Sequence, residues 1–146
     1  MRLLALAALG AALALTFTSL APATQKKRMK VRATCSTEHT PLPPAGSGED
    51  FARENFILRR RSKAVKRARV TGKLTDLTLA DGDNVTSRTD SDTTDAGGEA
   101  ELEFEFNNFG DYQISWKVRK RGYRTRTGTV KFHVKDRVSG ACSTFR

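Results

Sequence analysis

The chain has 146 residues, and its 26 Lys and Arg residues against 16 Asp and Glu residues give a formal net charge of +10. Beyond the first 23 residues no segment is apolar enough to cross a bilayer, which excludes further transmembrane segments. A chain of this length buries only a modest core, and we expect a single domain without internal repeats.

The first 23 residues have the pattern of a secretory signal peptide. Arg2 supplies the positive start, residues 3–15 form an almost unbroken Leu/Ala run, and Ala21-Pro22-Ala23 is a small-x-small cleavage site. The apolar run is short for a membrane span, so a cleaved signal peptide is favoured over an uncleaved anchor. We therefore expect a secreted, extracellular protein.

Cys35 and Cys142 are the two cysteines of the chain. An even, minimal number of cysteines in an oxidising compartment favours one internal disulfide, with two free thiols or an intermolecular bridge as alternatives. The internal bridge would stabilise the fold by roughly 4 kcal/mol in the chain-entropy model. Neither cysteine has the sequence context of an activated nucleophile.

Residues 24–50 are first basic and then rich in Pro and Gly (TPLPPAGSGED), which predicts an extended N-terminal arm or linker. Residues 51–63 fit a short helix or a first strand. The strand is favoured because the segments after it are all predicted strands. In this organisation residues 51–146 form the folded domain.

The next strand is predicted in residues 64–79, where Ala68, Val70 and Leu74 share one parity. Turns are expected at residues 81–84 and 90–98, on either side of a short polar strand at 85–89.

The strongest pattern lies in residues 94–134, where apolar and polar residues alternate through three runs separated by turns at 107–111 and 120–122. This period fits strands with one buried face. About seven short strands at regular spacing predict an all-β protein, an antiparallel two-sheet sandwich. The expected core positions are Ala100, Leu102, Phe104, Phe106, Tyr112, Ile114, Trp116, Val118, Val130, Phe132 and Val134.

Within this region TTDAGGEAELEF, FGDYQISWKV and RGY resemble bacterial immunoglobulin-like domains, and the prealbumin-like domain found beside some secreted carboxypeptidases is similar. The resemblance covers about 40 residues and implies an immunoglobulin-like fold, in which glycines form turns and a tyrosine packs. The matching residues are Thr94, Asp95, Gly98, Ala100, Gly110, Tyr112, Gly122 and Tyr123.

The charge is unevenly placed. Residues 24–75 hold 14 basic and 4 acidic residues, residues 76–111 hold 1 and 11, and residues 112–137 hold 9 and 1. In an immunoglobulin-like sandwich we expect residues 64–76 to pair with residues 99–106. Arg67, Arg69 and Lys73 would then face Glu101, Glu103 and Glu105 and stabilise the ladder by roughly 0.2–1 kcal/mol for each pair.

Three further basic clusters are left without such partners, and clusters that meet on one face would attract polyanions. The predicted aromatics fall on core parity, so specific nucleic-acid recognition is not expected. Lys26, Lys27, Arg28, Lys30 and Arg32 form the first cluster, and Lys63 and Lys66 belong to the second. The candidate binding residues are Arg59, Arg60, Arg61, Lys117, Arg119, Lys120, Arg121, Arg124 and Arg126.

Other kinds of site have less support. Asp90, Asp92 and Asp95 could supply oxygens for calcium, but their spacing differs from an EF-hand loop and Asp is common in turns. His39 and His133 lie in no zinc-like pattern. Because no nucleophile elbow or carboxylate pair is present, we expect neither a metal site, a cofactor nor an enzyme.

The sequence therefore favours a secreted, monomeric binding module that associates with anionic cell-envelope polymers through its basic clusters. The alternative is a structural or interaction protein that binds another protein through a sheet edge. Salt separates the two, because electrostatic binding to a polyanion weakens with added salt.

Overall fold

The computed structural model describes residues 25–42, 47–78, 87–106, 109–136 and 139–145, and the predicted signal peptide lies outside these ranges. The described residues form ten β-strands and no helix, and they contain no segment of helix able to cross a membrane. The strands are β1 (Lys30–Leu42), β2 (Ser47–Arg60), β3 (Lys63–Ala64), β4 (Arg69–Asp76), β5 (Ser87–Thr93), β6 (Glu99–Phe106), β7 (Gly110–Arg119), β8 (Arg126–Val134), β9 (Gly140–Ala141) and β10 (Ser143–Phe145).

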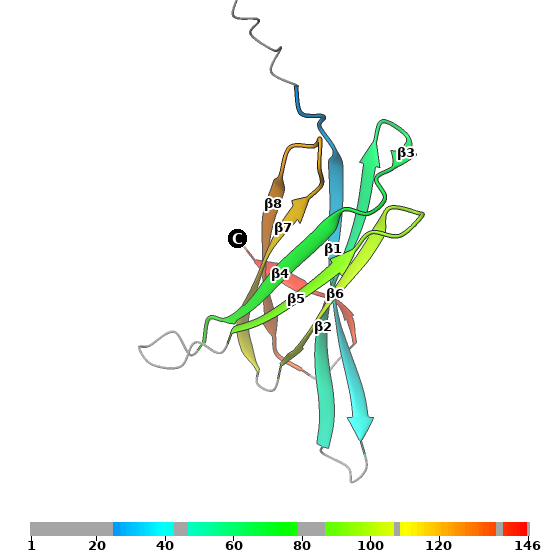
Figure 1. Ribbon diagram of the computed structural model, residues 1–146. Coiled ribbons are helices and arrows are strands. Elements are labelled where there is room, and N and C mark those ends of the chain that lie inside the picture. Colours follow the sequence, from blue (N-terminus) through cyan, green and yellow to red (C-terminus); the bar gives the residue numbers. More distant parts are fainter. Residues whose placement is uncertain (1–24, 43–46, 79–86, 107–108, 137–138, 146) are drawn as a thin grey trace, which may run out of the picture.

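The strands form two antiparallel sheets of five strands each that pack face to face (Figure 1). In the first sheet β9, β1 and β2 lie in that order, and β3 and β6 both pair with the far edge of β2. The second sheet has the order β10-β8-β7-β4-β5. This confirms the predicted all-β sandwich of two antiparallel sheets.

The core follows the predicted alternation. On β6 every second residue, from Ala100 to Phe106, is buried, while the glutamates between them are exposed. Tyr112 and Phe132 stack with their ring centroids 5.7 Å apart. The Trp116 ring also turns inward, with its centroid 5.4 Å from that of Phe56.

Gly128 makes room for this tryptophan. Trp116 and Gly128 are register partners on β7 and β8. A Cβ atom added to Gly128 would lie 2.1 Å from the Trp116 ring, so a larger residue here would force the ring to move.

The structure differs from the sequence-based prediction at the N-terminal side. Residues 30–42, placed in the predicted arm, are β1, and they pair along their whole length with β2. Residues 51–60 continue β2, which confirms a strand rather than a helix there. Likewise, residues 90–93 of the predicted long turn belong to β5.

The predicted pairing of residues 64–76 with residues 99–106 is wrong. β4 lies between β7 and β5 in the second sheet, whereas β6 pairs with β2 in the first. Arg69 therefore faces Thr93 and Arg119 across the ladder rather than a glutamate, and Lys73 faces Thr89 and Ser115.

Aspartate carboxylates join the two sheets where β5 and β6 run side by side. Asp90 accepts the N–H of Ser91 through Oδ1 at 2.7 Å and that of Glu103 through Oδ2 at 2.9 Å. Asp92 accepts the N–H groups of Thr93 and Glu101 in the same way, at 2.6 and 2.9 Å. These carboxylates thus take the place of backbone carbonyls along the free edge of β6.

The C-terminal segment links the sheets on the opposite side. β9 pairs with β1, β10 pairs with β8, and Cys142 lies between them. Cys142 forms the predicted disulfide with Cys35 of β1, with a Cα–Cα distance of 5.4 Å.

A buried threonine organises the chain between β5 and β6. Thr94 is 2% exposed, and its Oγ1 donates to the carbonyl of Val65 and accepts the N–H of Ala68, both at 2.8 Å. Its own N–H donates to the Ala68 carbonyl at 2.9 Å. This one side chain satisfies two buried backbone groups that water does not reach.

Replacing Thr94 with valine should therefore destabilise the protein by about 1–3 kcal/mol, because the shape is kept while two buried backbone groups lose their partner. Urea unfolding measures the change. The matched control is Thr93→Val at the exposed neighbouring position, which should stay within about 0.5 kcal/mol of the parent. Equal effects at both positions would contradict the role given to the buried hydroxyl.

Candidate functional site

Three basic segments from distant parts of the chain meet at one end of the sandwich. The Lys27 N–H donates to the Gly122 carbonyl and the Arg124 N–H donates to the Lys27 carbonyl, both at 2.9 Å, so residues 25–30 lie along the β7–β8 turn. The β2–β3 turn at residues 61–62 lies at the same end (Figure 1). We call residues 26–30, 59–67 and 119–126 together the basic end.

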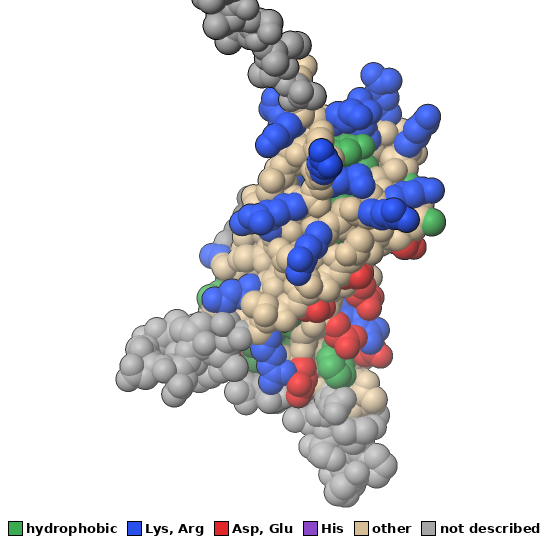
Figure 2. Space-filling model, viewed as in Figure 1, with side chains coloured by type: hydrophobic (Ala, Val, Ile, Leu, Met, Phe, Trp, Pro, Cys, Tyr) green, Lys and Arg blue, Asp and Glu red, His purple; other side chains and the backbone are tan. Residues whose placement is uncertain are grey.

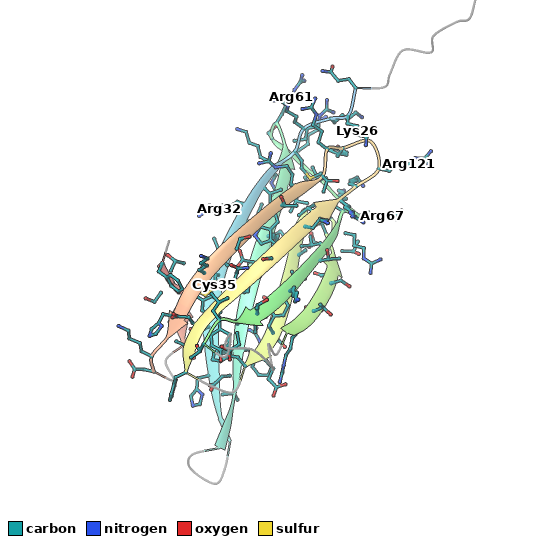
Figure 3. The ribbon with its side chains drawn as sticks, turned by 90° about the vertical axis from the view of Figure 1, so that its left-hand side faces the viewer. Lys26, Arg32, Cys35, Arg61, Arg67 and Arg121 are labelled. Carbon is teal, nitrogen blue, oxygen red and sulfur yellow. A yellow bond between two sulfur atoms is a disulfide. The ribbon has the colours of Figure 1, made fainter. Side chains whose placement is uncertain are left out.

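The side-chain view shows this convergence directly. Lys26, Arg61 and Arg121 gather at one end of the molecule, whereas Arg67 and Arg32 lie further down, on opposite sides of it (Figure 3). In the space-filling view, Lys and Arg side chains crowd the upper part, and Asp and Glu side chains are confined to the lower part (Figure 2). The fold therefore joins clusters that are separate in the sequence.

A hollow of about 750 Å³ opens at the basic end. Met29 is buried and belongs to the hydrophobic core, and Val31 packs against that core. The hollow thus has apolar residues and a surrounding group of cations. Its lining residues are Arg28, Met29, Lys30, Val31, Arg59, Arg60, Arg61 and Arg126.

Two of the predicted binding residues have structural bonds at this end. The Arg59 guanidinium donates to the Gly97 carbonyl and is half-buried. The Lys120 ammonium donates to the carbonyl of Lys66 and, at 3.4 Å, to that of Arg67. A carbonyl partner is neutral, so these bonds are not ion pairs. The exposed cations are Arg60, Arg61, Arg121, Arg124 and Arg126.

Lys117 and Arg119 were predicted to belong to the same cluster, and they lie two residues apart on the outward face of β7. Arg119 ends β7 at the margin of the basic end and pairs with Arg69. Lys117 lies further down the outward face of β7, opposite Thr71 and Thr127. The structure therefore assigns Lys117 to the face of the second sheet rather than to the hollow.

The ion pairs of the described residues lie away from the basic end. Arg53 of β2 bonds Glu38 at 2.5 Å and Glu103 at 2.8 Å, which raises its pKa, chiefly through the hydrogen bond to Glu103. Arg88 bonds Glu105 at 2.5 Å. In the described ranges no cation of the basic end has a carboxylate oxygen within 4.0 Å, so its positive charge is not neutralised by ion pairs.

Arg67, Arg69 and Lys73 are the cations to which the sequence analysis assigned the wrong neighbours. All three were expected to face glutamates, yet Arg69 and Lys73 face threonines of β5, and Arg67 lies beside Lys120 with a left-handed φ of +54°. Alternation shows which face of a strand is exposed but not which strand lies beside it. The sequence therefore carried no signal for the true neighbours of these residues.

The other candidate sites also have structural roles. The carboxylate of Asp95 accepts the N–H of Glu99 at 2.9 Å, and this bond, with a smaller contribution from Arg59, lowers its pKa. His39 contacts Asp50, and His133 contacts Asp111. Among the described side chains no group of three or more His, Cys, Asp or Glu residues is placed to hold a metal ion.

No protein-family model, curated protein or solved structure matches this chain. The structure itself shows an antiparallel two-sheet sandwich with a disulfide between Cys35 and Cys142. The chemistry of the site therefore rests on the geometry and charge of the described residues.

A buried glutamate was missed by the sequence analysis. Glu54 is 2% exposed and shares the inward parity of β2 with Ala52 and Phe56. Its Oε2 atom has no hydrogen-bond partner among the described residues. Burial raises its pKa from 4.5 to about 7. The signal was present, since an acidic residue on the apolar parity of a strand is unusual.

Glu54 should make stability depend on pH. The unfolded chain ionises this group near pH 4.5, whereas the folded chain holds its proton until about pH 7. Stability should thus be highest below pH 4.5 with respect to this group, and roughly 3 kcal/mol should be lost as the pH rises through 7.

Urea unfolding of the parent and of Glu54→Gln between pH 4 and 8 measures this contribution. The difference in unfolding free energy between the two proteins should shift steadily in favour of the variant as the pH rises, because an amide does not ionise. Glu101→Gln at an exposed position is the control and should run parallel to the parent. A parallel course for Glu54→Gln would show that the group titrates normally.

Proposed function

We propose that this protein is a secreted, immunoglobulin-like binding module that holds an anionic polymer of the cell envelope at its basic end. The observation that carries the proposal is the meeting of three basic segments whose cations have no ion pair with described carboxylates. Such a concentration of charge raises the free energy of the isolated protein, and a polyanion relieves it.

The chemistry of the basic end suits a flexible chain of negative charges. A bound polyanion releases its condensed counterions, and each contact with Lys or Arg adds to the affinity in a salt-dependent way. Arginine also bonds phosphate, sulfate and carboxylate groups through two parallel N–H donors. The hollow beside Arg60 and Arg61 offers such donors on several sides.

Three further observations support this proposal. The Cys35–Cys142 disulfide is typical of an oxidising compartment, as expected for an exported protein. The glycines of the immunoglobulin-like pattern adopt positive φ angles, +77° at Gly98 and +79° at Gly122. Tyr112 of the same pattern is buried against Phe132.

Binding of another protein through a sheet edge has less support. The N–H groups of Glu99, Glu101 and Glu103 on β6 already bond aspartate carboxylates. On the other side, β9 and β10 pair with parts of β1 and β8. These bonds occupy backbone groups that an added strand would need.

The proposal predicts that the protein without its signal peptide binds purified cell envelope and a soluble polyuronate, and that binding falls steeply with salt. The variant Arg60→Gln/Arg61→Gln/Arg121→Gln should bind at least about tenfold more weakly at moderate salt, and its log–log salt slope should fall by about three. Isothermal titration across a salt series gives both quantities.

The control removes the same charge elsewhere, in Arg32→Gln/Lys131→Gln/Lys135→Gln. These three residues are exposed on β1, on β8 and just after β8. The control should retain most of the affinity. Equal losses of affinity in the two variants would show that binding depends on the net charge of the protein and not on the basic end, which would overturn the proposal. Binding that does not change with salt would also overturn it.

A further inference from the structure

The outward face of the second sheet combines rows of hydroxyl groups with cations that have no ion pair among the described residues. Register places Ser91, Thr71, Lys117 and Thr127 in one row across β5, β4, β7 and β8. The next row holds Thr89, Lys73, Ser115 and Thr129. Neighbouring strands lie about 4.8 Å apart, and successive rows roughly 6.7 Å apart.

These rows line a shallow trough of about 740 Å³ on the face of the sheet. Arg69 lines the trough at the end nearer the basic end, where it pairs with Arg119, and Lys117 and Lys73 continue the row of cations diagonally. Figure 2 shows Lys and Arg side chains distributed over this side of the molecule. A positive track thus leads from the basic end down the sheet.

Three hydroxyl groups and two lysines of the trough have no partner among the described residues, whereas the Thr71 hydroxyl donates to the Lys117 carbonyl at 3.4 Å and the Ser115 hydroxyl accepts from Gln113 at 3.1 Å. Thr89, Thr127 and Thr129 are exposed, and their hydroxyl groups form no hydrogen bond with described residues. Lys73 and Lys117 have no carboxylate within 4.0 Å in the described ranges. Asp90 also lines the trough, but both of its oxygens accept backbone N–H groups.

Strand β6 of the first sheet presents the opposite character. Its outward side carries Glu99, Glu101, Glu103 and Glu105, all exposed. Arg53 and Arg88 neutralise part of this ladder. Four exposed glutamates are thus gathered on β6, while Lys73 and Lys117 on the face of the second sheet have no ion pair among the described residues.

We propose that this face is the docking track for an extended anionic polysaccharide, whose charged groups meet the lysines while its sugar hydroxyls bond the threonines and serines. The proposal rests on the proposed function, and it adds the class of polymer and the surface that binds it. Hydroxyl groups both donate and accept hydrogen bonds, which matches the hydroxyls of a sugar.

The same face is poorly suited to nucleic acid. Recognition of single strands relies on aromatic platforms for the bases, and Trp116, the aromatic residue nearest the trough, turns its ring inward onto Phe56. A polymer made only of charges, such as polyphosphate, offers acceptors but no donors, so it leaves the acceptor side of the threonine hydroxyls unused.

The test uses alginate, which carries a carboxylate and free hydroxyls on each sugar, and inorganic polyphosphate of matched charge, which carries no sugar. The variant Thr89→Val/Thr127→Val/Thr129→Val removes three hydroxyls from the trough and changes no charge. It should bind alginate about tenfold more weakly and bind polyphosphate within about twofold of the parent. Thr34→Val/Thr40→Val/Thr144→Val, at exposed positions off this face, is the matched control and should bind both polymers as the parent does.

The variants and polymers distinguish a failure of the docking track from a failure of the proposed function. Unchanged alginate binding by the trough variant, together with weak binding by Arg60→Gln/Arg61→Gln/Arg121→Gln, would overturn the docking track and leave the basic end intact. A parent that binds neither alginate, polyphosphate nor cell envelope would overturn the proposed function itself. Tighter binding of single-stranded DNA than of alginate would also overturn the docking track, and urea unfolding confirms that each variant is folded.

Discussion

The sandwich depends on carboxylates that act as surrogate backbone acceptors between β5 and β6. Asp90 and Asp92 each bond one N–H of their own strand and one of β6. Without them β6 would carry a row of unpaired donors at an exposed edge. The same bonds hold these negative charges against the β5–β6 edge, so the neighbouring face of the second sheet keeps its positive character. The hydrogen bonds of Asp90 and Asp92 therefore both join the two sheets and keep these negative charges at the β5–β6 edge.

Much of the fold was predictable because strand alternation is a local property. Ala100 to Phe106, Tyr112, Ile114 and Phe132 are buried on the expected face. β1 was missed because KVRATCSTEHTPL has few large apolar residues; Val31, Ala33 and Cys35 are only partly buried. β1 is held in the sheet by its long hairpin with β2. The alternation of apolar and polar residues in a strand does not tell which strand it will pair with.

The candidate site was also only partly predictable from the sequence. The basic residues were visible in the sequence, and Arg60, Arg61, Arg121 and Arg124 are exposed as expected. Their meeting at one end was not predictable, because it depends on the bonds of Lys27 to the β7–β8 turn. The hydroxyl rows were hidden for a similar reason. Thr71, Thr127 and Ser91 lie far apart in the chain and become neighbours only through the register of four strands.

The separation of charge along the molecule also gives it a permanent electric dipole, with the positive pole at the end that carries Lys26, Arg61 and Arg121 (Figures 2 and 3). A dipole turns in the field of a charged surface before any contact is made. A negatively charged surface would therefore give the protein a preferred orientation of approach, with the basic end first. Fewer encounters are then wasted, and the rate of capture is set by long-range torque as well as by the contacts formed afterwards.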